Sequence, residues 1–139
     1  MTPLDSDLRT GRLGRPGRDE KPMRRLLRAT INSWHGLIQA ARSEAAFRQE
    51  VTVFLVGVPV AFVVTAEPWK RYLLIGVLLF VLVVELLNTA VEKLSDRVSL
   101  EIDPQIGRVK DMGSAAVGLS LIIAGLAWIL ALAERLGLL

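Results

Sequence analysis

The chain of 139 residues lacks cysteine altogether, and this absence excludes disulfides, cysteine-based zinc sites and thiol nucleophiles. It is also poor in histidine. His35 is the only one, so a serine–histidine–aspartate triad would have to be built on it. No Gly-x-Ser-x-Gly turn accompanies this histidine. The sequence therefore gives no support to a disulfide-stabilised domain or to a serine hydrolase.

Charged residues are scarce in three long stretches of the chain, and nearly all the charge lies outside them. Hydrophobic residues make up 52% of the sequence, and the mean hydropathy is +0.44. A soluble globular domain is usually about 45–50% apolar. Because the apolar excess is concentrated in three blocks, the sequence predicts an all-α integral membrane protein with three transmembrane helices.

The net charge is +3 and the sequence pI is about 9.8. A basic balance can indicate a nucleic-acid-binding protein. Here the basic residues cluster beside the apolar stretches, so anionic lipid headgroups and the positive-inside rule explain them more simply. We therefore expect membrane lipids, and no nucleic acid, as partners.

Two segments precede the first apolar stretch. Residues 1–22 are rich in Arg, Gly and Pro and predict a disordered basic tail, without the apolar region of a signal peptide. Residues 24–42 show the helical period, with apolar residues such as Leu26 and Trp34 on one face and arginines opposite. This pattern predicts an amphipathic helix in the membrane interface. A helix packed on a soluble core is the alternative.

The three transmembrane helices are expected at about 45–66, 71–95 and 113–134. Pro59 falls inside the first, where a membrane helix tolerates proline. A polar loop is expected from about Asp96 to Met112, because Pro104 and Gly107 prevent one helix from running through it.

Lysine and arginine near the ends of these segments predict the orientation. The N-terminal segment has many arginines, and the second loop adds Lys93, Arg97, Arg108 and Lys110. The turn between the first two spans has only Lys70 and Arg71, and the C-terminus has only Arg135. The N-terminus and the second loop are therefore expected in the cytoplasm.

A row of polar residues runs along the second apolar helix: Glu85, Asn88, Glu92 and Asp96. At about 100° per residue they fall in a stripe no more than about 80° wide. A mid-membrane acid costs roughly 2.5 kcal/mol or more on insertion scales, so Glu85 is a candidate functional residue. The alternative is an interfacial acid that snorkels, followed by ordinary solvated residues.

Carboxylates also cluster where the amphipathic helix meets the first span, at Glu44 and Glu50. Together with Glu92 they predict carboxylates from two helices at one membrane depth. Such a pair could hold Mg²⁺, which prefers oxygen ligands and usually binds one or two carboxylates plus phosphates. An interfacial salt-bridge cluster is the alternative reading.

The segment from Gly107 to Ser114 combines Arg108 and Lys110 with the expected start of the third span. Basic side chains and backbone N–H groups at a helix N-terminus suit a polyphosphate. No P-loop sequence is present, and a positive-inside flank capped by Ser114 is the alternative.

Five motifs, in this order and spacing, resemble the prokaryotic diacylglycerol kinase family over about residues 24–132. They are Ser33-Trp34-His35-Gly36-Leu37, Glu44-Ala45-Ala46-Phe47-Arg48-Gln49-Glu50, Glu85-Leu86-Leu87-Asn88-Thr89-Ala90-Val91-Glu92, Asp96-Arg97 and Gly107-Arg108-Val109-Lys110-Asp111-Met112-Gly113-Ser114-Ala115-Ala116. The resemblance implies a membrane-embedded lipid kinase domain over residues 23–139. It also implies a homotrimer of the bacterial inner membrane that shares active sites between subunits and transfers the ATP γ-phosphate to diacylglycerol.

The resemblance also implies site residues. Glu85 resembles the catalytic base, and Glu44 and Glu92 resemble the Mg²⁺ ligands. The positions that resemble ATP contacts are Arg25, Asn32, Glu44, Glu92, Glu101, Asp103, Lys110 and Asp111. Those that resemble the lining of the lipid site are Arg25, Thr30, Trp34, Ala46, Phe47, Arg48, Gln49, Glu50, Glu85, Asn88, Ser114 and Trp128.

Three other functions stay open from the sequence. A sister group phosphorylates undecaprenol, although the run Phe47-Arg48-Gln49-Glu50 favours the diacylglycerol branch. A small proton- or cation-conducting oligomer would explain Glu85, but not Lys110 and Asp111. An amphipathic membrane scaffold would explain the surface helix alone.

Overall fold

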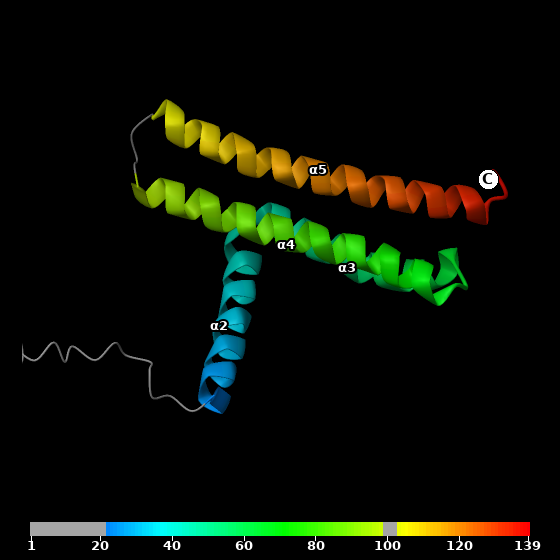
Figure 1. The fold of residues 1–139 in the computed structure, drawn as a ribbon, viewed down its shortest axis with the longest axis horizontal. Coiled ribbons are helices and arrows are strands. Elements are labelled where there is room, and N and C mark those ends of the chain that lie inside the picture. The colour runs from blue at the N-terminus through cyan, green and yellow to red at the C-terminus, as the bar shows by residue number, and fades with distance from the viewer. Residues whose placement is uncertain (1–21, 99–102) are drawn as a thin grey trace, which may run out of the picture. The chain divides into compact units, whose positions relative to one another are not determined.

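The computed structural model describes residues 22–98 and 103–139, which form four helices (Figure 1). They are α2 (Pro22–Ser43), α3 (Ala45–Val64), α4 (Pro68–Val98) and α5 (Pro104–Arg135). The helices α3, α4 and α5 are each long and apolar enough to cross a membrane. The all-α class and the three membrane-capable helices are thus confirmed. The predicted tail lies outside the described residues except for Pro22, which begins α2.

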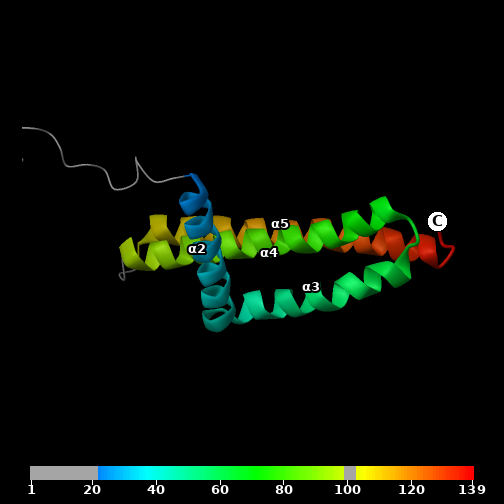
Figure 2. The same cartoon turned by 90° about the horizontal axis from the view of Figure 1, so that it is seen from below.

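The helix α4 packs against both α5 and α3, and α5 runs antiparallel beside it (Figures 1 and 2). A small apolar core of Ala61, Val64 and Leu74 joins the three helices toward the C-terminal end of α3. Gly57 of α3 lets Leu78 and Trp128 approach closely, because a Cβ at this position would meet the side chain of Leu78. Small residues at such crossings are typical of packed membrane helices.

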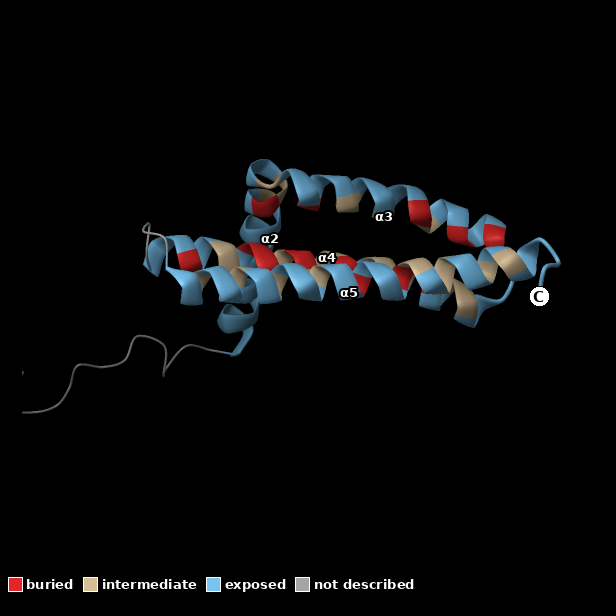
Figure 3. Cartoon of the chain, turned by 90° about the horizontal axis from the view of Figure 1, so that it is seen from above, coloured by how far each residue is buried: buried red, intermediate tan, exposed pale blue. Residues whose placement is uncertain are grey.

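Large apolar side chains cover the outer surfaces of these helices, for example Leu55, Phe62 and Ile129. Buried residues gather along α4, whereas most of α5 is exposed (Figure 3). Such an exposed apolar surface would favour aggregation in water, but lipid chains or further helices can cover it in a bilayer. Pro59 lies within α3 without ending it, as expected of a membrane helix.

The loop between the second and third spans is much shorter than expected, so the prediction of a loop from Asp96 to Met112 was wrong. Helix α4 continues to Val98, and α5 begins at Pro104. Pro104 starts the helix because its fixed φ suits the first turn, and Asp103 caps it by accepting the N–H of Gln105 at 2.7 Å. Gly107 lies inside this first turn and does not interrupt it.

The turn between α3 and α4 lies at the same end of the bundle as the C-terminus of α5. Lys70 bridges Glu67 at 3.1 Å and Glu134 at 2.5 Å, and the indole N–H of Trp69 donates to Glu67. The hydrogen bond from Lys70 holds the pKa of Glu67 below its usual value. A cavity of about 420 Å³ between α4 and α5 opens beside these residues. It is mainly apolar and lies away from the carboxylates described next.

Candidate active site

Three residues of the polar stripe on α4 line its packed side. Glu85 is only 6% exposed, Asn88 is also buried, and Glu92 is half-buried one turn further along. The amide of Asn88 donates to Oε1 of Glu92 at 3.1 Å, which is the i, i+4 spacing that places side chains over one another. Asn88 therefore fixes the direction of the Glu92 carboxylate.

The close approach of α5 positions Asn88 from the other side. A Cβ at Gly113 would collide with Oδ1 of Asn88, so glycine leaves room for the amide where it lies, and a larger residue would require the amide to shift. Within the described residues Oδ1 of Asn88 is buried and has no hydrogen-bond partner. An orphaned buried acceptor costs about 1–3 kcal/mol and needs an explanation, such as a donor or cation supplied from outside the chain.

Glu44 stands at the corner between α2 and α3. Its backbone is extended, with φ −111° and ψ 122°, and this breaks the helix into two. Its Oε1 accepts from Lys93 Nζ at 2.7 Å and from the hydroxyl of Ser43 at 2.9 Å. The hydrogen bond from Lys93, followed by the one from Ser43, lowers the pKa of Glu44. The carboxylate is therefore ionised and tied to α4.

Glu50 faces the same region from α3. Its Oε2 is buried and without a hydrogen-bond partner among the described residues, and its charge interacts with that of Glu85. Glu85 in turn interacts with the charges of Glu44 and Glu92. Glu85 thus lies within electrostatic range of three other carboxylates, and like charges so arranged call for a cation or a proton.

The carboxylates do not form a complete metal cage on their own. Across residues 22–98 and 103–139, no three acidic or histidine side chains converge as metal ligands. Glu44 and Glu92 both interact with the charge of Glu85, and two such carboxylates suit Mg²⁺ when a substrate phosphate completes the shell. The unpaired oxygens of Asn88 and Glu50 agree with a site that is finished by a bound molecule.

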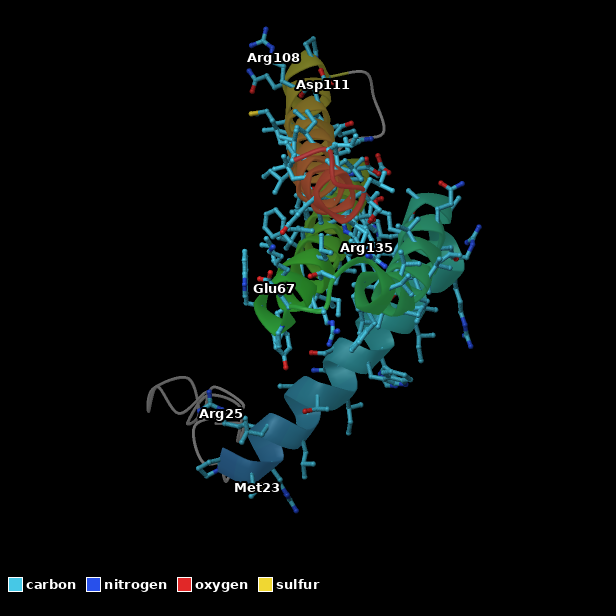
Figure 4. The ribbon with its side chains drawn as sticks, turned by 90° about the vertical axis from the view of Figure 1, so that its right-hand side faces the viewer. Met23, Arg25, Glu67, Arg108, Asp111 and Arg135 are labelled. Atoms are coloured by element: carbon cyan, nitrogen blue, oxygen red, sulfur yellow. The ribbon has the colours of Figure 1, made fainter. Side chains whose placement is uncertain are left out.

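The segment Gly107–Ser114 does not present a helix N-terminus, so that part of the polyphosphate prediction was wrong. Its backbone lies within α5, which begins at Pro104. The side chains remain available: Lys110 is half-buried and bridges Asp96 at 2.5 Å, while Asp111 is exposed. Arg108 projects from α5 (Figure 4). Glu101 lies outside the described residues.

The residues expected to line the lipid site differ in exposure. On α3, Phe47 is buried, whereas Ala46, Arg48 and Gln49 are exposed. Arg48 donates to the backbone of Ala41 and Arg42 at 3.5 and 3.4 Å, and so closes the end of α2. On α5, Ser114 is exposed. Of these positions, Arg48 holds the α2–α3 corner while it also faces outward.

Trp128 lies apart from the carboxylates. Its indole N–H donates to the backbone carbonyl of Leu74 at 3.3 Å. Leu74 precedes Glu85 by 11 residues on α4, which is roughly 16 Å at about 1.5 Å per residue. Trp128 is thus a packing residue of the α4–α5 contact, on the half of the bundle that holds the apolar core.

Four further predicted positions belong to the N-terminal part of α2, and all are exposed: Arg25, Thr30, Asn32 and Trp34. The hydroxyl of Thr30 donates back to the carbonyl of Leu26 at 3.0 Å. Their roles, and the location of this helix in the membrane interface, stay predictions.

Sequence reasoning missed two features of the site. Lys93 was counted only as a charge that sets orientation, yet it contacts both Glu44 and Ser43. Gly113 was read as part of a motif, yet it makes the room for Asn88. The position of Lys93 directly after Glu92 was the available signal for a role of Lys93 at the site. The role of Gly113 could not be read from the sequence, because it depends on how α4 and α5 cross.

Comparisons with known proteins bear on the same segments. The family model for prokaryotic diacylglycerol kinase matches residues 31–132. A protein of Pseudomonas aeruginosa named diacylglycerol kinase is 44% identical over 113 residues, which is 81% of this chain and 92% of that protein. The diacylglycerol kinase of Escherichia coli strain K12 is 41% identical over 81% of this chain and 93% of its own length. A Sinorhizobium diacylglycerol kinase is 36% identical over 87% of this chain and 88% of its own length.

The family model covers well over half of the chain, and these relatives are matched along most of their lengths. The matched region includes Glu44 at the α2–α3 corner, the polar stripe of α4, and Lys110 on α5. The protein therefore belongs to the prokaryotic diacylglycerol kinase family.

Proposed function

We propose that this protein phosphorylates diacylglycerol with ATP, giving phosphatidic acid and ADP at the cytoplasmic face of the bacterial inner membrane. The observation that carries the proposal is the group of carboxylates around buried Glu85, with two buried oxygens, on Asn88 and Glu50, that lack partners among residues 22–98 and 103–139. The names of the relatives support the substrate. Such a site suits a reaction between a lipid hydroxyl and a water-soluble anion.

In this proposal Glu85 is the general base. It accepts the proton of the lipid hydroxyl as that oxygen attacks the γ-phosphorus of ATP and the bond to the β–γ bridging oxygen breaks. No phosphoenzyme is required in this proposal, because the lipid hydroxyl attacks the phosphorus directly, in line with the departing ADP. Burial of Glu85 supports this role, because it excludes water that would otherwise compete as acceptor or nucleophile.

Glu44 and Glu92 would hold Mg²⁺ together with phosphate oxygens of ATP. Bound there, Mg²⁺ supplies neutralisation of the charge that phosphoryl transfer develops on those oxygens. The chain's own part is to orient the ligands. Asn88 directs the carboxylate of Glu92, and the α2–α3 corner directs that of Glu44.

The remaining roles are proposed from the resemblance of the motifs to the family. Lys110 supports the phosphates of ATP, with further nucleotide contacts from Arg25, Asn32, Glu101, Asp103 and Asp111. The lipid site is lined by the predicted positions on α2 and α3, Phe47 and Glu50 among them, and by Asn88 and Ser114. The large outward-facing apolar surface of α3 to α5 supports a homotrimer with shared sites and surrounding lipid. The arginines near the start of α2 support a cytoplasmic N-terminus.

A substrate competition tests the proposal. Purified protein in detergent micelles receives labelled ATP, Mg²⁺ and equal amounts of diacylglycerol and undecaprenol. We expect label in phosphatidic acid, at several-fold higher kcat/KM than in undecaprenyl phosphate. Preferential labelling of undecaprenol would mean that undecaprenol, and not diacylglycerol, is the substrate of the same lipid-kinase reaction.

A further inference from the structure

An ion pair occupies the carboxylate that the proposed function assigns to the metal. Nζ of Lys93 lies 2.7 Å from Oε1 of Glu44 and 3.2 Å from the hydroxyl of Ser43, which lies 2.9 Å from the same Oε1. This carboxylate oxygen therefore has two donors. Mg²⁺ binds oxygens at about 2.0–2.1 Å, so it has to compete with an ammonium group for Glu44.

Lys93 lies in sequence and in space beside the residues that are expected to bind the metal. It follows Glu92, the second expected ligand, directly in α4, and reaches across to the corner between α2 and α3. The ammonium group thus contacts the first expected ligand, and its residue is next in sequence to the second.

The ion pair between Lys93 and Glu44 is also weak enough to dissociate when a cation binds. The side chains of Lys93 and Glu44 are 47% and 29% exposed, and exposed ion pairs are weak. Lys70 at the other end of the bundle is different, because it is 17% exposed and is paired with two carboxylates.

We propose that Lys93 is an internal counter-ion of the metal site, holding Glu44 while no divalent cation is bound and leaving it when one binds. The inference rests on the proposed function for the assignment of Glu44 and Glu92, and adds a residue that sets metal affinity. Lys93 is a positioning residue, since it acts through Glu44 and not on the reacting atoms.

The test measures binding of Mn²⁺, a paramagnetic stand-in for Mg²⁺, to the full chain in detergent micelles. Electron paramagnetic resonance reports the free ion, in the absence of nucleotide. Lys93→Met removes the competing charge at similar length, so the Kd for Mn²⁺ should fall about two- to fivefold, the range that a weak exposed ion pair accounts for. Lys93→Arg keeps the charge and should bind Mn²⁺ within about twofold of the unmodified protein.

Two controls isolate the effect. Lys70→Met removes a lysine with two ion pairs far from the site and should leave the Kd unchanged. In a Glu44→Gln background, Lys93→Met should no longer tighten binding, because the contact under test is gone. Unchanged or weaker Mn²⁺ binding in folded Lys93→Met protein, or tightening that persists without Glu44, would overturn the inference.

Lipid phosphorylation in the same preparations separates this inference from the proposed function. Suppose that the unmodified protein phosphorylates diacylglycerol, and that Lys93→Met has the same Kd for Mn²⁺ as the unmodified protein. The counter-ion role is then wrong and the function stands. If Lys93→Met tightens Mn²⁺ binding through Glu44 but no lipid is phosphorylated, the counter-ion role stands and the function is wrong.

Discussion

Replacement of Glu85 by glutamine tests the chemistry most sharply, because it removes the proton acceptor while keeping the shape of the side chain. Glu85 is 6% exposed, so bulk water has little access to take over as base. A general base contributes typically about 10²–10⁴-fold. We therefore expect turnover to fall by that factor, which corresponds to roughly 3–5 kcal/mol in the barrier, with little change in the KM for ATP.

The same substitution should not destabilise the protein. Glu85 lies within electrostatic range of Glu44, Glu50 and Glu92, so a neutral amide removes repulsion among like charges. The Tm should remain equal or rise, which separates lost chemistry from lost folding. Thermal unfolding in micelles and a steady-state titration of both substrates measure the two quantities.

Glu50→Gln is the matched control, because Glu50 is a half-buried carboxylate of this group whose buried Oε2 has no hydrogen-bond partner in the described part of the chain. As part of the lipid site it should raise the KM for diacylglycerol and keep turnover within about tenfold of the unmodified protein, below the range of a lost base. Turnover of Glu85→Gln within about threefold of the unmodified protein, or a larger loss in Glu50→Gln, would refute the assignment of the base.

Three further predictions concern the surroundings of Glu85. Glu92→Gln should weaken Mg²⁺ binding, so that activity falls and partly returns at high Mg²⁺; activity that no Mg²⁺ concentration restores would argue for another role. Gly113→Ala should displace Asn88 at the α4–α5 crossing, cost about 1–3 kcal/mol of stability as overpacking does, and raise the Mg²⁺ requirement, both measured against the unmodified protein. Trp34→Ala should raise the KM for diacylglycerol several-fold, whereas Arg25→Ala should raise that for ATP. An identical defect in both would mean that α2 acts only as a brace.

The sequence predicted the features that depend on local pattern. Three apolar stretches predicted three membrane-capable helices, and the i, i+3, i+7 spacing predicted that Glu85, Asn88 and Glu92 share a face. Both follow from the period of the helix and from segregation of charge, which are properties of short windows of sequence.

One prediction was wrong because two local sequence signals compete, and two contacts were missed because they depend on how the helices pack. Pro104 and Gly107 were read as loop residues, yet proline at the start of a helix with Asp103 as its cap extends α5 toward α4. The pairing of Lys93 with Glu44 joins residues that are far apart in sequence, so no local pattern reveals it. The same holds for the fit of Gly113 against Asn88.

The central claim is that the carboxylates around Glu85 serve phosphoryl transfer to a lipid and not ion conduction. The most direct measurement places the purified protein in sealed vesicles that contain diacylglycerol, adds ATP and Mg²⁺, and records phosphatidic acid, ADP and ion flux together. The account predicts one phosphatidic acid for each ADP, no ion leak, and loss of both products in Glu85→Gln. An ion leak that depends on Glu85, without phosphatidic acid, would contradict it.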